Sequence, residues 1–127
     1  MKNSYIVDTN IILRFLLEDN LPQQKQAARW FKQAEQNKLN LYIKTIVVAE
    51  SCYVLESYYK MSRQKIGNVF EVLLSQRWLH VEQRNILLAL WPWYIRGFHF
   101  VDSYLQTTAQ IEDIKVLTFD KKILTNN

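Results

Sequence analysis

The sequence predicts an α/β fold in which a parallel sheet is covered by helices on both faces. Short β-type runs alternate with longer helical patterns along the chain, and this alternation favours parallel strands joined by helical crossovers. The 127 residues include only two glycines and two prolines, so most of the chain is expected to be regular structure. Right-handed crossovers would place the carboxyl ends of all the strands at one edge of the sheet.

Length and composition are those of one ordinary globular domain, expected to span residues 1–127. The net charge of +4 is compatible with a nucleic-acid partner but is also common in proteins without one. The single cysteine, Cys52, excludes an internal disulfide and favours a reducing, cytoplasmic location. No apolar run is long enough to cross a bilayer, so no membrane association is expected.

Four strands and six or seven helical segments are expected along the chain. The strands are predicted at residues 4–7, 39–43, 78–81 and 115–118. The helices are predicted at residues 10–17, 22–37, 46–59, 63–75 and 100–112, and a short one begins near Lys121. The stretch 82–95 is also helix-like, and Pro92 within it predicts either a kink or a stop.

Two aspartates directly follow predicted strands. Asp8 comes after the first strand, and Asp120 comes shortly after the last one. Each could simply cap the following helix, a common role for an aspartate in that place. Because the carboxyl ends of parallel strands share one edge, we also expect these two carboxylates to lie close together.

Glu50 lies inside an apolar stripe of the predicted helix 46–59. Its neighbours at positions i−4, i−1, i+3 and i+4 are Ile46, Ala49, Tyr53 and Val54. Burying an unpaired carboxylate is costly, so such a residue usually faces a cation or a polar cleft. The alternatives are a glutamate that reaches water at the edge of the stripe or one that pairs with an arginine.

Asp102 lies in the first turn of the predicted helix 100–112, where the helix dipole alone would favour an acid. The starts of the helices that carry Glu50 and Asp102 can reach the same sheet edge as Asp8 and Asp120. Four carboxylates gathered there could not all stay ionised without a cation, and Mg²⁺ or Mn²⁺ prefers such ligands. The inner face of this helix is expected to be formed by Val101, Leu105, Thr108 and Ala109.

Four motifs, in this order, resemble those of the PIN domain: Ile-Val-Asp-Thr-Asn, Val-Val-Ala-Glu-Ser, Phe-Val-Asp-Ser-Tyr-Leu and Val-Leu-Thr-Phe-Asp-Lys-Lys-Ile. Within that family the chain is most similar to the short toxin nucleases of the VapC type. The resemblance implies a three-layer α/β/α sandwich with a central, mainly parallel sheet of four or five strands. Because the sequence ends at Asn127, we expect the fifth, edge strand to be missing. Bulky or polar residues at positions 103–108 depart from the small residues usual in the third motif.

The resemblance implies a metal-dependent endoribonuclease, a hydrolase of RNA phosphodiesters. Asp8, Glu50, Asp102 and Asp120 would then be the acidic cluster that holds Mg²⁺ or Mn²⁺. Its polar supports would be Thr9, Asn10 and Thr118. The resemblance also implies a homodimer and, for the toxin branch, a cognate antitoxin that fills the cleft.

The basic residues Lys121, Lys122 and Arg96 are candidates for contacts with RNA, although lysines on a short helix are ordinary surface residues. The aromatic cluster at residues 91–94 could stack on bases, but a core or subunit surface is the favoured interpretation. A catalytically silent, RNA-binding PIN-like module and a PIN nuclease outside any toxin–antitoxin pair remain alternatives. A receiver domain or an aspartyl phosphatase fits poorly, since both need acids that are absent around Asp8.

Overall fold

The computed structural model describes residues 2–126, so the first and last positions of the predicted domain lie outside it. Three short strands, β1 (Ser4–Ile6), β2 (Asn40–Ile43) and β3 (His80–Val81), form a parallel sheet in the order β1-β2-β3. In this register Tyr5 pairs with Leu41, and Tyr42 pairs with His80. The predicted α/β architecture with a parallel sheet is thereby confirmed.

The helices begin where the sequence provides capping groups. At three helix starts, the side chain of the capping residue accepts a hydrogen bond from a backbone N–H. The caps are Asp8 before α1 (Thr9–Leu16), Asn20 before α2 (Leu21–Glu35) and Ser62 before α4 (Arg63–Leu74). Pro92 lies in the first turn of its own short helix, so the predicted segment 82–95 stops and restarts as two helices. The helices are α1 (Thr9–Leu16), α2 (Leu21–Glu35), α3 (Thr45–Ser57), α4 (Arg63–Leu74), α5 (Arg84–Ala89), α6 (Trp91–Ile95), α7 (Phe100–Glu112) and α8 (Lys121–Asn126).

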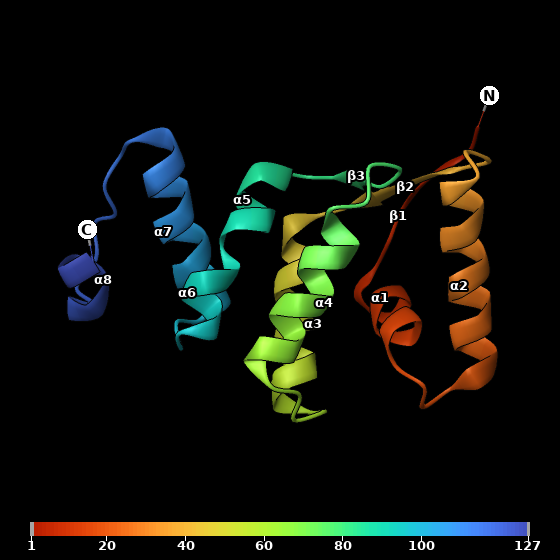
Figure 1. Cartoon of the computed structure of the whole chain (residues 1–127), viewed down its shortest axis with the longest axis horizontal. Coiled ribbons are helices and arrows are strands. Elements are labelled where there is room, and N and C mark those ends of the chain that lie inside the picture. The colour runs from red at the N-terminus through yellow and green to blue at the C-terminus, as the bar shows by residue number, and fades with distance from the viewer. Residues whose placement is uncertain (1, 127) are drawn as a thin grey trace.

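The helices follow one another along the length of the molecule (Figure 1). In Figure 1, α1 and α2 lie on one side of the strands and α3 and α4 on the other, while α5 to α8 continue outward to the end of the molecule. The aromatic cluster at residues 91–94 lies in the core, because Trp91, Trp93 and Tyr94 are all buried and Trp91 stacks on Phe70. Among the described residues, no helix is both long and apolar enough to cross a bilayer.

The prediction of a fourth strand at residues 115–118 is wrong for this structure. The described residues form three strands, rather than four or five, and residues 114–120 connect α7 to α8 without regular secondary structure. A strand needs a neighbour to take its backbone hydrogen bonds. Here α7 packs against α5 and α6, which leaves the segment at the far end of the molecule from β1 (Figure 1).

The predicted inner face of α7 is also partly wrong. Ala109 is buried as expected, but Val101 and Leu105 are exposed. Buried instead are the polar residues Ser103, Gln106 and Thr107. The Phe100 ring packs edge-on against the core residue Trp91, and Gln106 Nε2 donates to the backbone oxygen of Ile123 on α8 at 3.2 Å. These contacts rotate α7 so that apolar side chains face outward.

Candidate active site

Asp8 follows β1 at the carboxyl edge of the sheet and caps α1. Its Oδ1 accepts a hydrogen bond from the backbone N–H of Ile11 at 3.1 Å, so the predicted capping role is present. The Asp8 side chain is exposed, and a carboxylate can accept further bonds from other directions. Capping therefore leaves this carboxylate able to bind a ligand as well.

Thr9 connects this end of β1 to the helix that carries Glu50. The Thr9 hydroxyl donates a hydrogen bond to Glu50 Oε1, which joins α1 to α3. The prediction that Glu50 lies in a buried stripe is wrong here, since Glu50 is exposed together with Ile46 (77% exposed) and Tyr53 (70% exposed). Ala49 and Val54, on the other side of Glu50, are partly buried against the core, so Glu50 lies at the exposed edge of the stripe.

Asp102 lies in the first turn of α7, at the end of that helix that meets α3. It is half-buried. A cavity of about 190 Å³ is lined jointly by α3, through Ala49 and Tyr53, and by the start of α7, through Val101. The structure thus brings the Asp102 end of α7 to the helix that carries Glu50.

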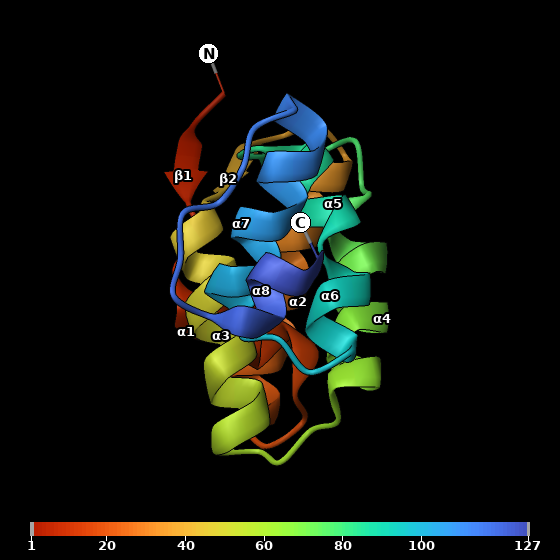
Figure 2. The same ribbon diagram turned by 90° about the vertical axis from the view of Figure 1, so that its left-hand side faces the viewer.

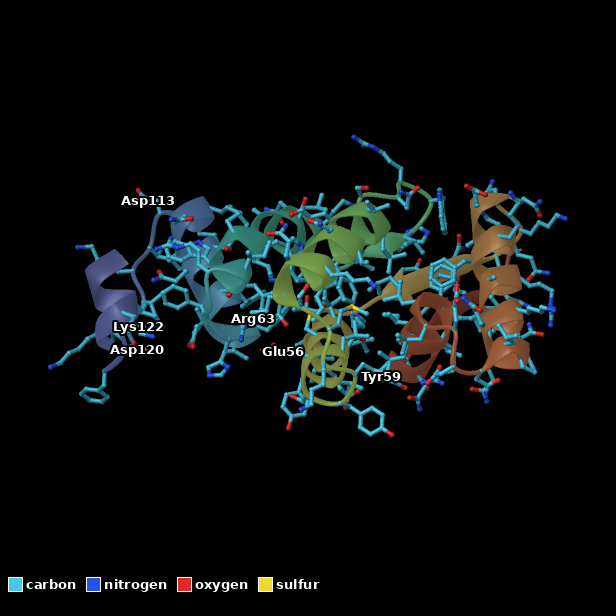
Figure 3. All side chains as sticks on the ribbon, turned by 60° about the horizontal axis from the view of Figure 1, so that its bottom comes forward. Glu56, Tyr59, Arg63, Asp113, Asp120 and Lys122 are labelled. Carbon is cyan, nitrogen blue, oxygen red and sulfur yellow. The ribbon has the colours of Figure 1, made fainter. Side chains whose placement is uncertain are left out.

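Asp120 lies apart from this region. It precedes α8, where its Oδ1 accepts from the backbone N–H of Lys122 at 2.9 Å and its own N–H donates to Thr118 Oγ1 at 3.0 Å. Figure 3 places Asp120 and Lys122 with α8 at one end of the molecule, while α1 lies toward the other end. Asp120 and its predicted support Thr118 are therefore not brought to Asp8.

As they are placed, the acidic residues do not make a metal site. Within residues 2–126, no three histidine, cysteine, aspartate or glutamate residues lie close enough together to hold a metal ion. A hard divalent cation in a protein takes several oxygen ligands in a compact shell. Asp8 and Glu50 are joined through Thr9, but Asp120 lies with α8 at one end of the molecule (Figure 3).

Glu82 and Gln83 contribute to this edge of the sheet, a role that the sequence interpretation missed. Glu82 follows β3, and its Oε1 accepts from the backbone N–H of Thr45 at 2.9 Å. This capping bond to Thr45, with a smaller contribution from Lys44, lowers the pKa of the Glu82 carboxyl. Gln83 Oε1 accepts from Thr45 Oγ1 and from Tyr104 Oη, which ties α3 to α7. The position of Glu82 directly after a predicted strand was the available signal, as for Asp8.

A hollow of about 400 Å³ adjoins Asp8 on the α1–α2 side. It is lined by amide and guanidinium groups, which can bind phosphates, by an indole ring, which can stack on a base, and by the Asp8 carboxylate. Arg96, predicted to contact RNA, is not part of this lining. Its guanidinium lies over the Trp93 ring, 5.0 Å from the centroid. The lining includes Asp8, Asn10, Arg14, Gln23, Gln26 and Trp30.

Comparison with known families identifies the family of the chain. A family model described as the PIN domain matches residues 5–126, almost the entire sequence. The chain belongs to the PIN domain family. PIN domains are generally nucleases, and PIN nucleases generally use divalent metals. No curated protein and no solved structure matches the sequence significantly.

The match to the PIN model runs from β1 through α8, so it includes all four acidic residues and the segment before α8. A PIN domain suggests nucleic-acid binding, which is consistent with the positive net charge. The hollow beside Asp8 is the surface of this PIN domain where donor groups and an aromatic ring adjoin an acidic candidate.

Proposed function

We propose that this PIN domain is an Mg²⁺- or Mn²⁺-dependent endoribonuclease of the VapC type, the toxin of a toxin–antitoxin module. The observation that carries the proposal is the arrangement at the end of β1, where Asp8 caps α1 and Thr9 links that helix to Glu50. In a PIN domain, this places two of the four predicted acids at adjoining positions on the carboxyl side of the sheet. The four ordered motifs described above support the assignment to toxins.

Charge supports the metal dependence. A cluster of carboxylates repels the phosphodiester that it must approach, and a bound divalent cation removes that repulsion. Asp8, Glu50, Asp102 and Asp120 are the residues assigned to the cation, with Thr9, Asn10 and Thr118 as their polar supports.

RNA enters through the hollow beside Asp8. Gln23 and Gln26 offer amide donors to the strand, and the exposed ring of Trp30 offers a surface for a base. Arg14 is held in this hollow by Asp19 at 2.8 Å and by the Tyr59 hydroxyl at 2.9 Å. Its fixed guanidinium places a positive charge near the path of the RNA backbone.

The test is cleavage of a fluorescently labelled RNA mixture with Mg²⁺ or Mn²⁺ present. We expect the Asp8→Asn variant to lose at least about a hundredfold in rate, because the charge that binds the cation is removed while the cap is kept. EDTA should abolish wild-type cleavage. The matched control is Glu71→Gln, an exposed acid on α4, which should cleave as the wild type does. Equal cleavage by wild type and Asp8→Asn, indifferent to EDTA, would overturn the metal-dependent mechanism, whereas no cleavage by the wild type would favour the silent binding module.

The toxin assignment has its own test in cells. Expression of the wild-type chain should arrest growth, and Asp8→Asn should not. Co-expression of the small protein encoded by the neighbouring reading frame should restore growth and give a complex that can be purified. Cleavage in vitro without growth arrest or a neutralising partner would instead favour a PIN nuclease outside a toxin–antitoxin pair.

A further inference from the structure

The first strand of the sheet has an open edge. Within the described residues, β1 pairs with β2 on one side only, and Figure 2 shows β1 at the outer margin of the sheet. Ile6 on this strand is 68% exposed. An unpaired, apolar edge strand is a ready template for a further strand.

A groove adjoins β1 and β2 where they face α2, and its lining includes Leu39 and Leu41 as well as residues of β1. It has a volume of about 390 Å³, and most of its lining is apolar, including Tyr5, Ile6, Val7, Ile11 and Trp30. A groove of this size can accept two or three apolar side chains from an added strand. What it lacks is a strand that presents them.

The same chain contains a segment with a β-type sequence that forms no strand in this structure. Residues 114–119 read Ile-Lys-Val-Leu-Thr-Phe, a β-type sequence, and Leu117 and Phe119 are fully exposed. No backbone hydrogen bond joins residues 115–119 to a strand in the described part of the chain. One molecule therefore contains both a strand with an open edge and a β-type segment that pairs with no strand among the described residues.

Alignment of the strand-end aspartates gives a register for the pairing. If Asp120 lies beside Asp8 in a parallel ladder, Leu117 lies beside Tyr5 and Phe119 beside Val7. Leu117 and Phe119 then share one face of the sheet with Tyr5 and Val7, which line the groove. This register fills the groove and places the missing carboxylate next to Asp8.

The segment is held away from the β1 of its own chain. The backbone N–H of Ile114 bonds to Ala109 O on α7, and buried Ile123 fixes α8 against α7 through Gln106. The segment and β1 overlap in Figure 2, but Figure 1 shows them far apart, with α3 to α6 between them. Pairing of residues 114–119 with β1 of the same chain would require α7 to leave α5 and α6. A second copy can supply the segment without that rearrangement.

We propose that two copies of this chain exchange these segments, so that residues 114–119 of each copy pair with β1 of the other. Asp120 of one copy then joins Asp8 and Glu50 of its partner, and each active site contains residues of both chains. The inference deepens the proposed nuclease function and rests on it for the role of Asp120. It also explains why the four acids do not converge within one chain.

Cross-linking tests the exchange without any reference to activity. Asn3→Cys and Lys115→Cys each change an exposed residue five positions before its strand-end aspartate. When the two single variants are mixed and treated with a short bismaleimide, we expect a covalent dimer that contains one chain of each kind. Native Cys52 is buried, so the wild type should not react. Pairing Asn3→Cys with Glu71→Cys, an exposed position on α4, should give no product.

The double variant, with Asn3→Cys and Lys115→Cys on one chain, distinguishes pairing within one chain from pairing between two chains. Linkage between chains supports exchange. Linkage within a monomer, or no linkage at all in the mixture of single variants, would overturn it.

Mixing two inactive variants tests the shared site. Asp8→Asn and Asp120→Asn should each lack cleavage alone. In a mixed dimer, one site combines the intact Asp8 of one chain with the intact Asp120 of the other. Random pairing makes half of the dimers mixed, with one intact site in two, so about a quarter of wild-type activity should return. Circular dichroism should show both variants folded.

The results distinguish the two proposals. Cross-linked dimers with no recovered cleavage, while the wild type cleaves RNA, would overturn the shared site and leave the exchange standing. A wild type that does not cleave RNA, yet forms the cross-link, would overturn the proposed function alone.

Discussion

Asp8 stabilises the fold as the cap of α1, independently of any catalytic role. Its bond to the N–H of Ile11 satisfies one of the free donors at the start of α1. We expect Asp8→Ala to lower the free energy of unfolding by about 0.5–2 kcal/mol, and Asp8→Asn to change it little, because asparagine is an equally good cap. Urea unfolding of the two variants measures this difference. Equal destabilisation by both substitutions would mean that the negative charge, rather than the cap, stabilises α1.

Glu82 gives the stability of the chain a component that depends on pH. Its folded-state pKa is lowered, chiefly by the bond from the Thr45 N–H, relative to the ordinary value of 4.5. The resulting stabilisation is fully present above that value and is lost as the pH falls through the lower, folded-state pKa. We expect urea midpoints of the wild type and Glu82→Gln to differ most near neutral pH and to converge in acid. A constant difference across that range would contradict this.

At the scale of elements, Arg84 holds the end of α4 and the turn before β3. Its guanidinium donates to three backbone oxygens, those of Leu74, Gln76 and Leu79. We expect Arg84→Met to lower the free energy of unfolding by about 2–4 kcal/mol, because these carbonyl groups lose a charged donor. Arg84→Lys should be less damaging than Arg84→Met, because its ammonium keeps a charged donor. It should still destabilise the protein, since one ammonium cannot reach all three backbone oxygens. The control is Arg77→Met, an exposed neighbour, which should stay within about 0.5 kcal/mol of wild type.

Most elements could be predicted from the sequence because their causes are local. The caps at Asp8, Asn20 and Ser62 mark helix starts through bonds within three residues. The outcome at residues 115–118, where the predicted strand does not form in the described chain, could not be foreseen in the same way, since a strand depends on a distant partner that the pattern does not name. The rotation of α7 is a similar case, because it is set by contacts with Trp91 and α8 rather than by the spacing of Val101 and Leu105.

The candidate site shows the same division. Asp8 and its contact through Thr9 with Glu50 follow from helices that start next to each other at the sheet edge. The position of Asp120 depends on where the last segment docks, which is a property of packing between elements. The sequence therefore predicts which residues belong to the site, whereas their convergence depends on the whole molecule.

For the whole molecule, the exchanged dimer makes Leu117 an interface residue. Leu117 is fully exposed within one chain, so Leu117→Asp should leave the folding of the monomer intact. In the dimer it would bring a charge into the groove, and we expect the dissociation constant to rise about ten- to hundredfold. Sedimentation velocity over a dilution series measures this. Val72→Asp, at an exposed position on α4, is the control that should dimerise as the wild type does. An unchanged constant for Leu117→Asp would contradict the exchange.

The open edge of β1 also has a consequence for the order of events during synthesis. The ribosome makes β1 at the start of the chain and residues 114–119 near the end of this sequence. At a synthesis rate of about 5–20 residues per second, several seconds pass between the synthesis of β1 and that of residues 114–119. During that interval, the finished chains nearest to it are products of ribosomes ahead on the same messenger RNA. The first segment that a new β1 can capture thus belongs to an older copy, which favours pairing between chains made in succession from one message.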